Sequence, residues 1–119
     1  MTQENKDLLL RDLCARLPYG VKIQVPYEDG SGYFDETVWE VNNEGPFHVN
    51  GWGIEYEYVK PYLFPLSSIT KKTLEELSAY IDIKNAYVAV EFFNSHHIDY
   101  RGLIEKGLAI DATGLNIYF

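Results

Sequence analysis

Closely spaced turn signals constrain this chain most, because they divide residues 21–58 into short segments that alternate in polarity. Glycines and asparagines mark tight turns at 28–32, 43–46 and 50–51. Residues between the turns alternate as half-buried strands do. The expected strands are 21–25, 33–42, 47–49 and 54–58. Four or five short antiparallel strands within about forty residues predict a small, twisted, mostly antiparallel sheet or a partial β-barrel.

An N-terminal helix is expected before this sheet. An apolar stripe runs from Leu10 to Leu17, and Pro18 follows it, which predicts a helix over about 4–17. Cys14 lies on the stripe, so we expect its thiol to be buried and inert. A single cysteine also leaves the chain without an internal disulfide.

Helices are expected after the sheet as well. Thr70 can cap a middle helix over about 70–82. Two prolines within 60–66 favour an extended connector rather than a regular strand. Asp99 can cap a short C-terminal helix over 103–106. The sequence therefore predicts one α+β domain over 1–119, with an N-terminal helix, a middle helix and a helical C-terminal segment around the sheet.

Residues 86–98 allow two interpretations. Val88, Val90 and Phe92 alternate as in a strand, whereas Val90, Phe93 and His97 fit one face of a helix. Periodicity alone does not decide between helix and strand in so short an apolar run.

The formal net charge of −8 is concentrated in residues 28–57, which contain no Lys or Arg. The acidic residues there are Glu28, Asp29, Asp35, Glu36, Glu40, Glu44, Glu55 and Glu57. Their field repels phosphate backbones and attracts cationic surfaces. We therefore expect no nucleic-acid partner and a protein partner with a basic surface.

Targeting and membrane signals are not found in the sequence. The first residues lack a basic region followed by an apolar one, and no apolar run approaches the roughly 20 residues of a membrane helix. The sequence thus predicts a cytoplasmic protein without a membrane partner. It contains neither a calcium loop nor a glycine-rich phosphate loop, so no cofactor is predicted.

Three blocks of sequence carry a resemblance to a known family. They are LLLRDLCARLPYGVK at 8–22, VKPYLFPLSSIT at 59–70 and FNSHHIDYRGLIEKGLA at 93–109. Together they resemble small uncharacterised proteins encoded by gut bacteria of the Bacteroides type and by their phages and mobile elements. That family has no assigned activity, cofactor or catalytic residue, so the resemblance implies none here. It implies a helix over 89–98, and phage association implies a host protein as partner.

The densest group of catalytic residue types is His96, His97, Asp99, Tyr100 and Arg101. Such a group can supply a base and a metal ligand, and a small hydrolase or metal-dependent enzyme is one hypothesis. The spacing argues against it, because adjacent histidines on a helix point about 100° apart. In the structural interpretation Asp99 caps a helix, Arg101 pairs with an acid, one histidine packs and the other is solvated. We therefore predict no metal site and favour a non-enzyme.

Aromatic residues crowd the acidic β region, in larger number than so small a sheet is expected to bury. The favoured hypothesis is a non-enzymatic protein-binding module with an acidic, aromatic β face. Its expected binding residues are Glu36, Trp39, Glu40, Trp52, Glu55 and Glu57. In a third hypothesis the same face is the contact of a homo-oligomer.

Overall fold

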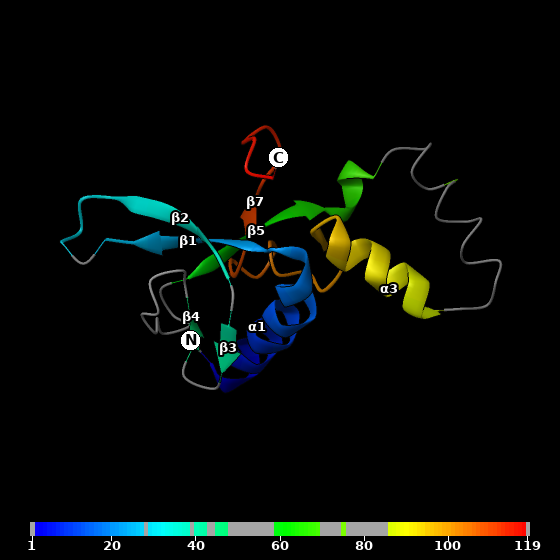
Figure 1. Cartoon of the computed structure of the whole chain (residues 1–119), viewed down its shortest axis with the longest axis horizontal. Coiled ribbons are helices and arrows are strands. Elements are labelled where there is room, and N and C mark those ends of the chain that lie inside the picture. The colour runs from blue at the N-terminus through cyan, green and yellow to red at the C-terminus, as the bar shows by residue number, and fades with distance from the viewer. Residues whose placement is uncertain are drawn as a thin grey trace.

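A helix packed against an open, mixed five-stranded sheet forms the frame of the molecule (Figure 1). This computed structural model describes residues 2–27, 29–38, 40–42, 45–47, 59–69, 75 and 86–118. The α+β class predicted from the sequence is confirmed. The partial barrel is wrong, because the strand order β2-β1-β5-β6, with β7 beside β5, leaves the sheet open.

Helix α1 (Gln3–Arg16) begins at Thr2, whose hydroxyl accepts a hydrogen bond from the Asn5 amide at 3.1 Å. Its bounds confirm the predicted N-terminal helix. Leu9 and Leu13 are fully buried against the sheet, whereas Cys14 is exposed, so the expected burial of that thiol is wrong. The buried face of α1 consists of Leu9, Asp12, Leu13 and Arg16. Cys14 lies outside this face.

Strands β1 (Lys22–Pro26) and β2 (Tyr33–Thr37) form the expected antiparallel hairpin. At its turn, the Tyr27 amide donates to the Gly32 carbonyl at 2.9 Å, and Gly30 has a φ of +75° that favours glycine. Ile23 and Val25 of β1 point into the core. β2 pairs with β1 alone among the described strands, so it is an edge of the sheet.

Strand β5 (Lys60–Pro65) lies in the middle of the sheet, so the predicted irregular connector is wrong. Backbone groups alternate between the two edges of a strand, which places Tyr62 and Phe64 toward one edge and Pro61, Leu63 and Pro65 toward the other. On the second edge Ala112 N–H donates to the Leu63 carbonyl at 2.8 Å. Pro61 and Pro65 lie on either side of the short stretch of β5 that pairs with the strand at 110–111. Their missing N–H groups therefore remove no hydrogen bond between these strands.

Strands β6 (Ile98–Asp99) and β7 (Ile110–Asp111) both run parallel to β5. The sheet is therefore mixed rather than mostly antiparallel. Residues 103–107 form turns between these strands, so the predicted C-terminal helical segment is wrong. Their backbone closes by a 2.9 Å bond from the Leu108 amide to the Leu103 carbonyl.

The remaining elements are short. Strands β3 (Glu40–Asn42) and β4 (Gly45–Phe47) form a separate pair, and single 3-10 turns occur at Leu17–Tyr19 and Leu66–Ser68. Helix α3 (Ala86–Ser95) decides the ambiguity over 86–98 in favour of helix, followed by β6. The expected strand at 54–58 and, apart from Glu75, the middle helix over 70–82 lie outside the described residues.

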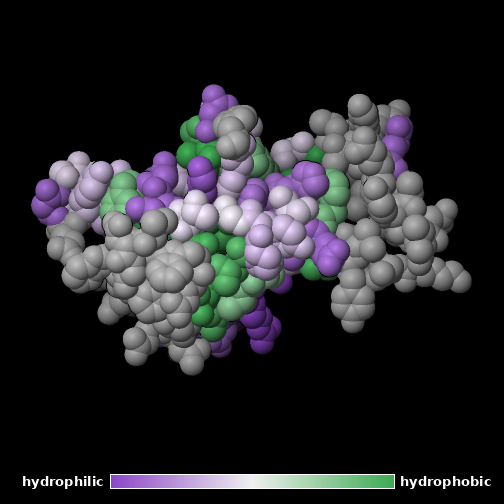
Figure 2. Space-filling view, viewed as in Figure 1, coloured by the Kyte–Doolittle hydropathy of each residue, from purple (hydrophilic) through white to green (hydrophobic). Residues whose placement is uncertain are grey.

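The core lies between α1 and one face of the sheet. It consists of Leu9, Leu13, Val21, Ile23, Val25, Val38, Val59, Leu63, Leu103, Leu108 and Ala109. In the space-filling view, hydrophobic side chains gather below the sheet, over α1 (Figure 2). The opposite face of β1, β2 and β5 carries the polar residues of the alternating pattern, among them Gln24, Asp35 and Tyr62.

Candidate functional site

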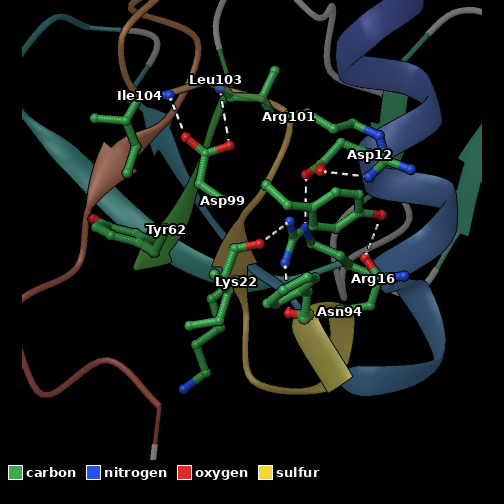
Figure 3. Close-up of polar contacts among 12 residues, drawn as sticks. Asp12, Arg16, Lys22, Tyr62, Asn94, Asp99, Arg101, Leu103 and Ile104 are labelled. Carbon is green, nitrogen blue, oxygen red and sulfur yellow. Dashed lines mark hydrogen bonds and ion pairs between the residues drawn. The ribbon is translucent and has the colours of Figure 1, made fainter. Parts of the chain in front are cut away.

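The predicted cluster at 96–101 folds around the start of strand β6. Asp99 is buried, and its two carboxylate oxygens accept hydrogen bonds from the Leu103 and Ile104 amides, each at 2.9 Å (Figure 3). It therefore caps the turn that follows β6, although no helix forms there. Both oxygens of its carboxylate are occupied by backbone donors.

Arg101 reaches back to helix α1, where its Nη1 lies 2.9 Å from Asp12 Oδ1 (Figure 3). Asp12 also pairs with Arg16, whose Nε lies 2.8 Å from Oδ2, and both partners of that pair are completely buried. Arg16 further donates to the carbonyls of Phe93, at 3.3 Å, and Ile98. One buried arginine thus ties together α1, the end of α3 and the start of β6.

Tyr100 completes this arrangement with an aromatic ring. The Arg101 guanidinium lies 4.4 Å from the ring centroid and that of Arg16 lies 5.4 Å from it. The Tyr100 hydroxyl donates to Asn94 Oδ1 at 3.0 Å. The ion-paired cluster of Asp12, Arg16, Asn94, Tyr100 and Arg101 is accordingly satisfied by its own members and by backbone carbonyls.

The two histidines have different surroundings. His96 is exposed, and its Nδ1 lies 3.1 Å from Ser95 Oγ. His97 is buried with a φ of +57°, and its ring stacks on Tyr118 with centroids 3.7 Å apart. Burial, and then the positive charges of Arg16 and His96, lower the pKa of His97 to about 4. Its Nδ1 has no hydrogen-bond partner among the described residues.

Tyr118 is held by backbone groups at the point where β1 separates from β5. Its hydroxyl accepts from the Lys22 amide at 2.9 Å and donates to the Tyr62 carbonyl at 2.7 Å. Phe64 on the same edge of β5 instead donates to the His97 carbonyl at 2.8 Å. The phenol therefore bridges the fork between β1 and β6, and burial raises the pKa of its hydroxyl above the usual value of 10.

These contacts bring His97, Asp99 and Arg101 into one region but give each a structural partner. Within the described ranges, no group of three or more His, Cys, Asp or Glu side chains is arranged to hold a metal ion. Ser95 Oγ lies 3.1 Å from His96 Nδ1, but each of these atoms also lies 3.0 Å from the Phe92 carbonyl oxygen, which closes the end of α3. This region stabilises the junction of α1, α3 and β6.

The predicted acidic, aromatic face is described only in part. Trp39, Trp52, Glu55 and Glu57 lie outside the described residues, and for Glu40 the structure gives only the backbone, in β3. Glu36 lies in β2, opposite Ile23 of β1, and is half-buried. The structure therefore brings no pair of these predicted binding residues together in the part of the chain that it describes.

The β1–β2 hairpin carries acidic and aromatic residues that the binding prediction did not include. Tyr27 is 48% exposed and Tyr33 is 64% exposed. The Tyr27 ring packs on Phe34 at a centroid distance of 5.1 Å, which holds it at the hairpin surface. Asp29 Oδ1 accepts a hydrogen bond from the Ser31 amide at 2.8 Å. Hydrogen bonds from Ser31 lower the pKa of Asp29.

Asp35 of edge strand β2 lies on the polar face of the hairpin, where the side chain of Tyr62 from β5 reaches it. The Tyr62 hydroxyl donates to its Oδ1 at 2.5 Å, and Gln24 Nε2 donates to that hydroxyl at 3.2 Å. Burial, followed by the hydrogen bond to Asp35, raises the pKa of Tyr62 to about 12. Asp35 is thereby fixed in place as an exposed carboxylate.

No ion pair within the described ranges involves a carboxylate of the hairpin. The ion pairs there join Asp12 to Arg16 and Arg101, and none involves Asp29, Asp35 or Glu36. Lys22 of β1 lies diagonally opposite Asp35 in the cross-strand register, and Lys60 of β5 lies one strand farther, with its backbone about 10 Å from that of Asp35.

Sequence reasoning missed the residues that organise the cluster at 96–101. Asp12 and Arg16 are four positions apart on α1, which is the spacing of a helical ion pair, and this spacing is a usable signal. Tyr118 gives no comparable signal, because it meets Lys22 across 96 positions of sequence.

Comparisons of this chain with protein-family models, with curated proteins and with solved structures find no match. In the described portion no helix has the length and apolar character needed to cross a membrane.

Proposed function

We propose that this protein is a non-enzymatic binding module that docks a cationic protein surface on its acidic, aromatic β region. The observation that carries this proposal is the β1–β2 hairpin, in which exposed Tyr27 and Tyr33 flank carboxylates that form no ion pair among the described residues. Exposed tyrosines are frequent anchors of protein interfaces, since they bury much area at little entropic cost. The carboxylates add long-range attraction and select against other acidic surfaces.

The structural roles of the cluster at 96–101 support this proposal over an enzymatic function. Asp99 and Arg101 already have backbone and ion-pair partners, and His97 is covered by Tyr118. A general base needs access to the proton that it removes. We further propose that the chain belongs to the Bacteroides and phage family that its three blocks resemble and that it acts in the cytoplasm, on a host protein.

A capture experiment with matched variants tests the docking proposal. The full chain, D29N/D35N/E36Q and the control D7N/E91Q/E105Q are each immobilised and exposed to bacterial lysate at low salt and at about 0.5 M salt. Both triple variants lose the same charge, but the control residues lie outside the hairpin. The variant E36Q/E40Q/E55Q/E57Q tests the carboxylates predicted from the sequence.

We expect one basic partner that the wild type and the control retain at low salt, and that D29N/D35N/E36Q loses. High salt is expected to release it from all variants, because exposed charges are then screened. Equal capture of the partner by D29N/D35N/E36Q and the wild type would contradict the proposal. So would capture that is unaffected by salt.

A further inference from the structure

The outer edge of strand β2 carries backbone groups without partners in the described structure. Tyr27 N–H donates to the Gly32 carbonyl, and Val38 N–H donates to the Val21 carbonyl. In this register the backbone N–H and C=O groups of Phe34 and Glu36 point toward β1. Backbone groups alternate in direction along a strand. The N–H and C=O groups of Tyr33, Asp35 and Thr37 therefore point outward, away from β1.

This edge is exposed at Tyr33 and Asp35 and half-buried at Thr37. No strand among the described residues pairs with it, and Tyr33 and Asp35 are exposed. Figure 1 shows the hairpin projecting beyond α1, with β2 as its outer strand. An exposed edge of this kind is a template for pairing with another strand.

The side chains of β2 select what can pair there. Asp35 lies on the polar face of the sheet and Glu36 on the opposite face, so a strand added beside β2 meets a carboxylate on both of its faces. Directly opposed residues of neighbouring strands have Cβ atoms about 5 Å apart, at which unlike charges attract and like charges repel. A partner strand therefore needs Lys or Arg at the two neighbouring positions opposite Asp35 and Glu36.

A second copy of this chain is a poor occupant of the same edge. Antiparallel pairing of two β2 strands centred on Asp35 would place the Asp35 and Glu36 carboxylates of one copy beside those of the other. The repulsion opposes the pairing, and neither β2 strand has a cation to offset it. Charge complementarity thus favours a basic strand from another protein.

We propose that the β2 edge binds an extended basic segment of the partner by adding it to the sheet as a further strand. This inference rests on the proposed docking function and specifies how the partner binds. Outward N–H and C=O groups of Tyr33, Asp35 and Thr37 supply the backbone hydrogen bonds. Asp35 and Glu36 select adjacent basic side chains, and Tyr33 packs against the added strand on the polar face.

The probe is a capped peptide of about seven residues, Thr-Val-Thr-Lys-Lys-Val-Thr, titrated into the full chain. Two derivatives carry N-methyl groups on alternate residues, one on the odd and one on the even positions. A third derivative has Gln in place of both lysines. N-methylation removes donors while it keeps the side chains and the charge, so the pair of derivatives separates strand addition from simple charge attraction.

We expect one N-methyl series to bind at least about tenfold more weakly than the parent, while the other series binds nearly as well. The Gln peptide should also bind about tenfold more weakly at low salt. In the complex, the amides of Tyr33, Asp35 and Thr37 should gain protection from hydrogen exchange. Those of Phe34 and Glu36 face β1 and should change little.

Thr37→Pro removes one outward donor and leaves every carboxylate and tyrosine in place, with Thr37→Val as its matched control. We expect the proline variant to bind the peptide about tenfold more weakly and the valine variant to bind as the wild type does. If Thr37→Pro does not fold, the N-methyl series still decides.

The outcomes separate the two proposals. Equal binding of both N-methyl series, with binding still lost in the Gln peptide, overturns strand addition and leaves the acidic docking surface intact. Equal binding of the Gln peptide overturns the role of charge and with it the proposed function. If the parent peptide does not bind at about 1 mM, strand addition is wrong. A dimer of the free chain that the peptide disrupts identifies a second copy as occupant and also overturns the inference.

Discussion

Asp12 is the residue on which the ion-paired cluster depends. It accepts from Arg16 and from Arg101, and both it and Arg16 are completely buried. Removal of one partner from such a pair leaves the other charge buried without compensation, which costs more than the loss of the attraction alone. The carboxylate is therefore required for Arg16 to remain between α1 and β6.

The first prediction concerns Asp12→Asn. We expect it to lower the free energy of unfolding by about 3 kcal/mol, because an amide cannot balance the buried guanidinium. Urea unfolding monitored by circular dichroism measures the change. Asp7→Asn, at an exposed position of the same helix, is the matched control and should cost less than about 0.5 kcal/mol. Similar losses in the two variants would show that Asp12 has no special role.

His97 makes stability depend on pH. The folded chain keeps this ring neutral down to about pH 4, whereas an unfolded chain protonates it near the ordinary value of 6.5. Its contribution is therefore fully present above pH 6.5 and is lost as the pH falls toward 4. The shift corresponds to no more than about 3 kcal/mol, since each pKa unit equals about 1.4 kcal/mol.

The second prediction compares unfolding free energies at about pH 7.5 and pH 4 in the wild type, His97→Asn and His96→Gln. Asn tolerates the positive φ of position 97, so the backbone is kept. His97→Asn should lose less stability on acidification than the wild type by up to about 3 kcal/mol. His96→Gln should behave as the wild type does. A His97→Asn variant with the full wild-type acid sensitivity would contradict this assignment.

At the scale of elements, Tyr118 links β1 and β5 beyond the end of their paired stretch, which covers Ile23–Pro61 and Gln24–Lys60. Its hydroxyl lies between the Lys22 amide of β1 and the Tyr62 carbonyl of β5, in the fork that β6 then occupies. The ring also covers His97. Tyr118 thus supplies hydrogen bonds to β1 and β5 where these strands no longer pair with each other.

The third prediction is that Tyr118→Phe destabilises the chain by about 1–3 kcal/mol, because it leaves a donor and an acceptor of the sheet without their shared partner. Tyr19→Phe is the matched control, since Tyr19 is exposed and its hydroxyl has no hydrogen bond in the described structure. Urea unfolding measures both. Hydrogen exchange should also accelerate at the Lys22 amide in Tyr118→Phe alone. Unchanged exchange at Lys22 would mean that the phenol is not its partner.

Local signals predicted the elements that depend on local chemistry. The bounds of α1 and the turn between β1 and β2 both follow from neighbouring residues, and Asp99 caps backbone amides as expected. Strand β5 was missed because its two prolines argue against a ladder unless the pairing edge is known. Strands β6 and β7 are two residues each, too short to show any period.

The candidate site was predicted less well than the fold, for a physical reason. Its residues interact across long stretches of sequence, as Arg101 does with Asp12 and Tyr118 with Lys22. Composition predicted an acidic, aromatic surface, but it did not indicate which edge of the sheet is free. That edge follows from the register of β1 and β2, which only the structure provides.

For the molecule as a whole, the ion-paired arginines and the carboxylates of the hairpin lie in different regions. The arginines at 16 and 101 are bound to Asp12 in the ion-paired cluster, at the junction of α1, α3 and β6. The carboxylates of the hairpin have no ion-pair partner among the described residues. This arrangement leaves an acidic projection available for a cationic partner.

The most direct measurement is the map of backbone amide shifts when the full-length chain is titrated with the lysine peptide at low salt. We expect the largest changes within 27–37, along a single binding curve. They should vanish in D29N/D35N/E36Q and persist in D7N/E91Q/E105Q. Changes centred on α1, α3 or the C-terminal residues, or changes in 27–37 that survive in D29N/D35N/E36Q, would contradict the proposed docking.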